Sequence, residues 1–174
     1  MEYTFKRREL VMRRTAFILA LLAGTCGGGT PTNVAGTYTL ALTIQQNQCG
    51  ILANDVGTSS TGVTVVVTQD GSNVTAKVQG VAGLALALAT GSDTFAGKVS
   101  GDSLDLSIDG SVAGSSDTCA FTRNAHLVGT VAGDLLTGSV TYTYATNKTP
   151  DCGTRDTCED IQLLTGARPP TVSR

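Results

Sequence analysis

The sequence predicts an all-β protein, in which an eight-stranded antiparallel up-and-down β-barrel follows a cleaved signal peptide. The first observation is a period-two alternation of apolar and polar residues, which begins near residue 35 and is typical of strands with one buried face. The second is the interruption of this pattern by short clusters of Gly, Asp, Ser and Asn, the residues of tight turns. The third is the lack of any convincing helical periodicity in the same region.

An export signal is predicted over residues 1–25. Five Lys and Arg residues lie between residues 6 and 14, an apolar run follows at 16–23, and Gly24 and Thr25 then precede Cys26. This order is that of a secretory signal, and the apolar run is shorter than the roughly 18–20 residues that a membrane-spanning helix needs. We therefore expect the segment to be removed rather than retained.

The run of small residues that ends in Cys26 resembles the lipobox of bacterial lipoproteins. In that family the cysteine becomes the lipidated first residue of the mature chain. The resemblance implies a cell-envelope protein that acyl chains anchor to a membrane, with the outer membrane as the expected one. Residues 26–34 contain three consecutive glycines and would form a flexible tether. The alternative is ordinary secretory cleavage near Ala23 or Thr25, which would release a secreted protein.

The rest of the chain has the size of one domain. Residues 35–168 are expected to form the barrel and residues 169–174 a disordered tail. After residue 25, seven Lys and Arg residues stand against twelve Asp and Glu residues, which leaves a net charge of −5. This balance argues against nucleic acid and anionic lipid head groups as partners. We expect a monomer.

Each predicted strand has an apolar face and a polar face. In the first strand, for example, Leu40 and Leu42 alternate with Thr39 and Thr43. The sequence LALALA at 84–89 would give nine strands if it were a separate strand, and the first and last strands would then be parallel. We therefore interpret it as an extension of the third strand or a bulged hairpin arm. The predicted strands are 36–45, 61–69, 73–79, 94–100, 103–109, 119–132, 135–145 and 158–167.

The short connections between these strands predict how the sheet is completed. A sheet with one apolar face must pack on a second layer or close on itself, and sequential strands with short turns favour an up-and-down barrel. A membrane barrel with its apolar face outward is the alternative. Such a barrel needs strands of roughly 9–11 residues and aromatic girdles, and most of the predicted strands are shorter.

Gly36, Thr37 and Tyr38 open the first strand, and Arg168 follows the last one. These residues resemble the calycin pattern of lipocalins and fatty-acid-binding proteins, in which Gly-x-Trp opens the barrel and a late Arg or Lys packs over the aromatic ring. Tyr38 stands where that pattern has Trp. The resemblance implies a barrel that is closed near Tyr38, with an open mouth at the opposite end that holds a small apolar ligand.

Cys49, Cys119, Cys152 and Cys158 form an even set behind an export signal, which predicts two disulfides. In an eight-strand meander, odd strands end and even strands begin at one rim, and all four cysteines fall at that rim. Strand adjacency favours Cys49 with Cys158 and Cys119 with Cys152. The rival pairing joins Cys49 to Cys119 and Cys152 to Cys158. A zinc site is disfavoured, because the paired C-x2-C spacing is absent.

Other polar residues give weaker signals. His126 is the only histidine, and strand parity places it on the outer face, so we expect an exposed residue rather than a catalytic base. Asp151, Asp156, Glu159 and Asp160 gather around the last inter-strand loop, where a solvated loop is favoured over a cation site. We therefore expect no metal, no cofactor and no enzymatic activity.

The inward faces combine aromatic with small residues, which would leave room for a ligand. The predicted ligand contacts are Phe95, Phe121, Arg123, Tyr142 and Tyr144. A buried Arg123 would need a carboxylate, a phenol or a ligand anion, whereas a register break near Cys119 would turn it outward. The first functional hypothesis is an envelope lipoprotein whose barrel binds a small hydrophobic molecule. The second is a non-enzymatic structural or protein-interaction module with a filled barrel.

Overall fold

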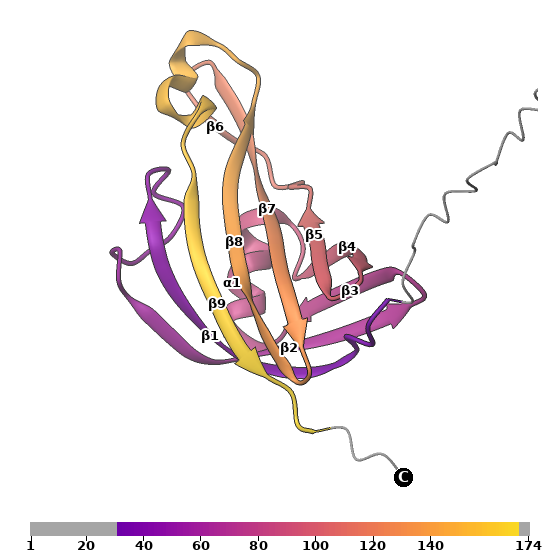
Figure 1. The fold of residues 1–174 in the computed structure, drawn as a ribbon. Coiled ribbons are helices and arrows are strands. Elements are labelled where there is room, and N and C mark those ends of the chain that lie inside the picture. The colour runs from indigo at the N-terminus through magenta and orange to yellow at the C-terminus, as the bar shows by residue number, and fades with distance from the viewer. Residues whose placement is uncertain (1–30, 171–174) are drawn as a thin grey trace, which may run out of the picture.

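The computed structural model describes residues 31–170, and in this range antiparallel strands enclose an apolar core (Figure 1). The predicted signal peptide, Cys26 with most of its tether, and residues 171–174 lie outside the described residues. The strands are β1 (Gly36–Asn47), β2 (Ser59–Asp70), β3 (Asn73–Val78), β4 (Thr94–Ser100), β5 (Ser103–Ile108), β6 (Gly114–Ser116), β7 (Cys119–Ala132), β8 (Leu135–Thr146) and β9 (Asp160–Ala167). Two helical segments, α1 (Gly80–Thr90) and η1 (Pro150–Asp156), complete the fold.

Eight of these strands close into a barrel, which confirms the predicted fold class. The strand order is β5-β4-β3-β2-β1-β9-β8-β7-β6, and an additional pairing of β5 with β7 completes the ring. All pairings are antiparallel, as an up-and-down meander requires. The ninth strand, β6, was not predicted. It has three residues and pairs with the first residues of β7, so it lies outside the ring.

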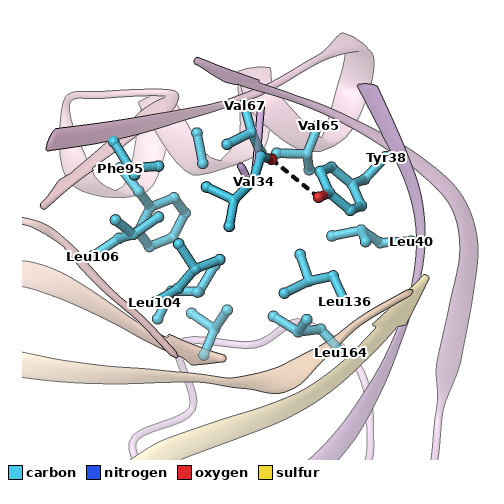
Figure 2. Packing of buried hydrophobic residues seen from close by; sticks show 14 of the residues in the cluster. Val34, Tyr38, Leu40, Val65, Val67, Phe95, Leu104, Leu106, Leu136 and Leu164 are labelled. Atoms are coloured by element: carbon cyan, nitrogen blue, oxygen red, sulfur yellow. Dashed lines mark hydrogen bonds between the residues drawn. The ribbon is translucent and has the colours of Figure 1, made fainter. Parts of the chain in front are cut away.

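The alternation read from the sequence sets which side chains fill the barrel. Along β5, Leu104, Leu106 and Ile108 are buried, while the residues between them are exposed. The same period appears in most of the other strands, because successive strand residues point to opposite faces of a sheet. Figure 2 shows the resulting core, in which side chains from β1, β2, β4, β5, β8 and β9 converge.

The segment predicted as a strand extension forms helix α1, which corrects the prediction. Residues 84–89 lie within α1, and the helix ends at Gly91, whose left-handed conformation (φ 97°) lets its N–H bind Ala87 O. Ala and Leu are among the best helix formers and Ala is a poor strand former, so propensity outweighs the apparent alternation. The alternation of Leu and Ala at 84–89 was also misleading as a strand pattern. A strand with one solvent-exposed face alternates apolar with polar residues, and this segment has no polar residue. The predicted lack of helix was wrong at η1 as well.

Residues around Tyr38 close one end of the barrel. Tyr38 is fully buried, and its hydroxyl donates a hydrogen bond to Val34 O at 3.0 Å (Figure 2). The Arg168 guanidinium lies over the Tyr38 ring, 5.7 Å from its centroid, within the range of a cation–π contact. Gly36 has a positive φ of 152°, and a Cβ there would lie 2.8 Å from Arg168 Cδ. These positions match the barrel closure expected from Gly36, Tyr38 and Arg168.

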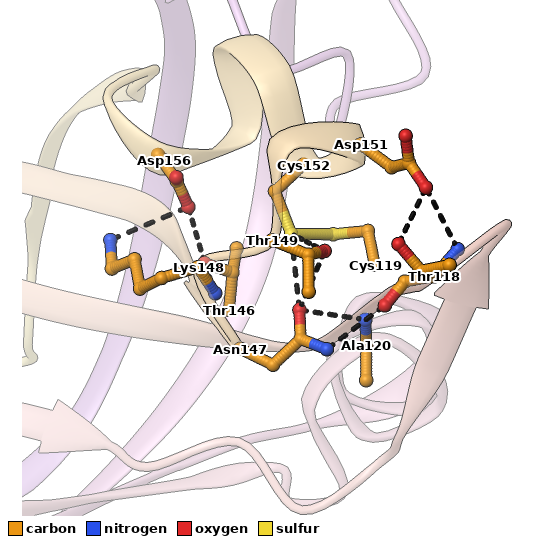
Figure 3. Close-up of a disulfide and its surroundings, with 10 residues drawn as sticks. All are labelled: Thr118, Cys119, Ala120, Thr146, Asn147, Lys148, Thr149, Asp151, Cys152 and Asp156. Carbon is orange, nitrogen blue, oxygen red and sulfur yellow. Dashed lines mark hydrogen bonds and ion pairs between the residues drawn. A yellow bond between two sulfur atoms is a disulfide. The ribbon is translucent and has the colours of Figure 1, made fainter.

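The two disulfides lie at the opposite rim. Cys49 is joined to Cys158 with a Cα–Cα distance of 5.1 Å, and Cys119 is joined to Cys152 at 4.9 Å. This is the pairing favoured by strand parity. Figure 3 shows how the second disulfide fixes η1 to the start of β7, close to a hydrogen bond from Thr118 to Asp151.

Candidate functional site

A cavity of about 330 Å³ lies inside the barrel and opens towards the disulfide rim. Its walls are almost entirely aliphatic and aromatic, with contributions from all eight strands of the ring and from α1. The volume is at the lower end of the roughly 300–1,000 Å³ that is usual for small-molecule pockets. The buried residues of the lining are Leu40, Val65, Val67, Ala76, Phe95, Leu104, Leu106, Leu127, Leu136, Val140 and Leu164.

Helix α1 covers part of the mouth. Ala82, Leu86 and Ala89 line the cavity from the inner side of the helix, whereas Leu84 and Leu88 on its other side are 61 % and 69 % exposed. The helix is therefore apolar on both faces, and the small side chains of Ala82 and Ala89 leave space open beneath it.

The loop after β1 forms another part of the mouth. Ile51 and Leu52 line the cavity, and the buried carboxylate of Asp160 accepts hydrogen bonds from their backbone N–H groups and from that of Cys49, at 2.7, 3.4 and 2.6 Å. A carboxylate that accepts several backbone N–H bonds holds a loop firmly. Asp160 and the Cys49–Cys158 disulfide thus fix the same loop over the cavity.

The polar groups of the cavity lie at its mouth. The Tyr142 hydroxyl donates a hydrogen bond to Gln162 Oε1 at 3.1 Å, and Ser60 is the other polar side chain of the lining. Burial raises the pKa of Tyr142 to about 12, so its hydroxyl stays neutral over the physiological range. Within the described part of the chain, no charged side chain lines the cavity.

The five predicted ligand contacts divide into two groups. Phe95 and Tyr142 line the cavity, whereas Phe121, Arg123 and Tyr144 lie outside its lining. The reason is the length of the strands. β7 and β8 have 14 and 12 residues, but the last β5–β7 pair is Ile108 with Ala125 and the last β8–β9 pair is Tyr142 with Asp160.

The residues of β7 and β8 beyond those pairs, 119–124 and 143–146, form a ribbon that projects past the rim. We call it the β7–β8 extension; Figure 1 shows it rising with β6 and η1 above the rest of the barrel. Phe121 and Tyr144 form an edge-to-face aromatic pair there, with ring centroids 5.0 Å apart. The Arg123 guanidinium lies over both rings, 5.6 and 5.7 Å from their centroids. Arg123 shares the inward parity of Phe121 and Ala125, but it is half-buried above the mouth.

The remaining predicted polar residues do not converge on one site. His126 is exposed, and its Nε2 lies 2.8 Å from Asp105 Oδ1 on the outer face. Asp151 bonds Thr118, while Asp156 bonds Thr146 and pairs with Lys148 (Figure 3). Hydrogen bonds lower the pKa of both carboxyls, the largest contributions coming from Thr118 and Thr146 respectively. In residues 31–170, no group of three or more His, Cys, Asp and Glu residues is placed to hold a metal ion.

Sequence reasoning missed the residues of α1 and of the loop after β1 that line the mouth. For α1 the available signal was its Ala and Leu content, which favours a helix. For Ile51 and Leu52 the signal was two large apolar residues next to Cys49, in a loop that would otherwise be polar.

No family model, curated protein or solved structure matches the chain in comparisons with known proteins. The closed eight-stranded antiparallel barrel is consistent with a calycin-like fold. The two disulfides indicate an oxidising, extracytoplasmic location. Within residues 31–170, no helix has the length and apolar character needed to cross a membrane.

Proposed function

We propose that this protein binds a small apolar molecule in its barrel, and that the chain is anchored in the cell envelope through a lipidated Cys26. The observation that carries the first part is the cavity of about 330 Å³ with its apolar walls. Such a space solvates an apolar molecule far better than water does, because burying apolar surface is favourable by roughly 25 cal/mol per Å².

The main alternative is a barrel filled by its own side chains, which acts as a structural or interaction module. An eight-stranded barrel is just wide enough to be filled in this way. The small side chains Ala76, Ala82 and Ala89 on the cavity wall favour binding over filling, because larger residues at these positions would occupy the space.

The position of the tether supports an orientation for the anchored protein. Thr32 N–H donates a hydrogen bond to Gly101 O, in the turn between β4 and β5, so the chain enters the barrel at its closed end. The disulfide rim and the cavity mouth lie at the opposite end. An anchor at Cys26 would therefore hold the closed end next to the membrane and direct the mouth away from it.

Binding is tested by native mass spectrometry of the purified domain with 1-dodecanol, a neutral apolar probe. Ala76→Leu fills the cavity, since Ala76 is 2 % exposed on its wall. Ala96→Leu is the matched control, because Ala96 lies on the neighbouring strand with its side chain exposed. We expect adducts on the wild type and on Ala96→Leu and about tenfold less on Ala76→Leu. Equal adducts on all three would count against the cavity as the site.

Anchoring is tested separately in cells. A lipidated protein would fractionate with membranes and would accumulate as an unprocessed form when globomycin blocks lipoprotein signal cleavage. Cys26→Ser should release it. A Cys26→Ser protein that still fractionates with membranes after a salt wash would contradict lipidation.

A further inference from the structure

Two arginines on one aromatic pair above the mouth point to the chemical class of the ligand. We propose that the ligand is an anionic amphiphile whose chain lies in the cavity and whose carboxylate or phosphate group is bound by Arg123 and Arg155. This inference rests on the proposed function, since it needs the cavity to hold the chain. It adds a charged subsite outside the cavity, formed by the β7–β8 extension and η1.

Both guanidinium groups lie against Phe121. The Arg123 guanidinium carbon is 5.6 Å and that of Arg155 is 5.1 Å from the ring centroid. Arg123 comes from β7 and Arg155 from η1, and both residues are half-buried. The Cys119–Cys152 disulfide joins the start of β7 to η1, so a covalent bond holds the two segments together.

Neither guanidinium is neutralised within residues 31–170. Arg123 and Arg155 form no side-chain hydrogen bond and no ion pair there, whereas Arg168 does both. Three acids of the same region are engaged elsewhere: Asp151 with Thr118, Asp156 with Thr146 and Lys148, and Asp160 with the loop after β1. The other two, Asp117 and Glu159, form no ion pair with either arginine within residues 31–170. Two like charges that share one ring repel each other, and an anion between them would relieve that repulsion.

Arg123 lies on the face of the β7–β8 extension that continues into the cavity wall. On β7, Arg123 and Ala125 have the same parity, and on β8 their partners are Tyr144 and Tyr142. Tyr142 lines the cavity mouth. Two strand residues advance by about 6.7 Å, so Tyr144 and Arg123 lie roughly one head-group width beyond the mouth on the same face of the ribbon.

The chemistry of the two places is complementary. The cavity has no charged lining residue in the described part of the chain, so it suits a hydrocarbon chain and not a charged group. Arginine presents a planar fork of donors that matches carboxylate and phosphate oxygens in bidentate geometry. Edge-to-face packing of Phe121 on Tyr144 holds the ring on which both arginines rest.

The test compares three probes with the same twelve-carbon chain: dodecanoate, dodecyl phosphate and 1-dodecanol. Their dissociation constants are measured by isothermal titration calorimetry on the disulfide-bonded domain. The variants are Arg123→Gln, Arg155→Gln and the double variant. Lys98→Gln is the matched control, because it removes one positive charge from an exposed residue of β4 outside the β7–β8 extension. Circular dichroism checks that each variant is folded.

We expect dodecanoate or dodecyl phosphate to bind more tightly than 1-dodecanol, and whichever is tighter identifies the anionic group. Each arginine variant should weaken anion binding by about tenfold, as for loss of a charge-assisted hydrogen bond, and leave 1-dodecanol binding unchanged. Lys98→Gln should change neither. The inference is overturned if all three probes bind equally and the arginine variants match the wild type, a result that leaves the proposed function intact. If no probe binds the wild type, the proposed function itself fails.

Discussion

Removing the Arg168 side chain should open the closed end of the barrel and cost about 3 kcal/mol of unfolding free energy. Its guanidinium donates hydrogen bonds to Ala35 O, to Asn33 O at 3.0 Å and to Gly133 O at 3.3 Å, and it pairs with Asp134 at 3.1 Å. A hydrogen bond contributes about 1 kcal/mol net, and the Tyr38 contact adds roughly 0.5–2 kcal/mol. The sum of these contributions is an upper bound. Two of the hydrogen bonds share the Arg168 Nη2 donor, and the partial exposure of Asp134 weakens the ion pair.

The measurement is equilibrium unfolding in urea, followed by circular dichroism with both disulfides intact. For a domain of about 140 residues, 3 kcal/mol corresponds to a fall of about 10 °C in Tm. Arg168→Lys keeps the charge but loses the planar fork, so it should cost about half as much as Arg168→Ala. Lys98→Ala, an exposed cation without an ion pair in residues 31–170, should change stability by less than about 0.5 kcal/mol.

Gly36→Ala should disturb the packing of Arg168 from the β1 side. The added Cβ would lie 2.8 Å from Arg168 Cδ on a backbone with a φ of 152°, so both crowding and strain oppose it. We expect a loss of about 2 kcal/mol. If Arg168→Ala and Gly36→Ala both unfold within about 0.5 kcal/mol of the wild type, Arg168 does not hold the barrel closed and the reasoning is refuted.

The remaining predictions concern the disulfides and one tyrosine. Loops of 109 and 33 residues predict that Cys49→Ser/Cys158→Ser loses about 4.8 kcal/mol and Cys119→Ser/Cys152→Ser about 3.7 kcal/mol; an equal loss in urea unfolding would contradict this order. Ultraviolet titration should show Tyr142 ionising near pH 12. Because its folded pKa lies above the unfolded value near 10, the stability that it contributes is present below pH 10 and lost as the pH rises towards 12. A Tyr142→Phe protein with the same alkaline stability profile would contradict this.

The barrel could be predicted because its strands obey one simple rule. In a strand with one buried face, apolar residues recur at every second position. This alternation identifies both the strand and its inward-pointing residues, such as Leu104 and Leu106 of β5. Strand parity then places all four cysteines at one rim without any knowledge of distances. The contact of Tyr38 with Arg168 was expected from the calycin resemblance alone.

The rule of alternating apolar residues does not predict that residues 80–90 form helix α1. Its LALALA sequence satisfies a period of two by composition alone, because Ala and Leu are both apolar and neither face is polar. Such a helix is stable only where it packs on something apolar, and the open barrel mouth provides that surface through Ala82 and Leu86. The sequence does not reveal that surface before the barrel is known.

The residues that line the cavity were predictable in part, for a related reason. Parity places Phe121, Arg123, Tyr142 and Tyr144 on the strand face that carries Ala125, but parity does not say where along a strand the barrel ends. That limit depends on the partners: β5 and β9 stop pairing at Ala125 and Tyr142, so the residues beyond them face the space above the mouth. The position of Arg155 against Phe121 was not predicted, because Arg155 lies in η1, where no strand parity applies.

The central proposal, that the cavity holds an apolar chain, is tested most directly by nuclear Overhauser effects between bound 1-dodecanol and the methyl groups of the protein. We predict contacts from the chain to the cavity-lining methyls of Leu86, Leu106 and Leu127. Contacts confined to the exposed α1 side chains Leu84 and Leu88, with none to the lining methyls, would show surface adsorption instead and would contradict the proposal.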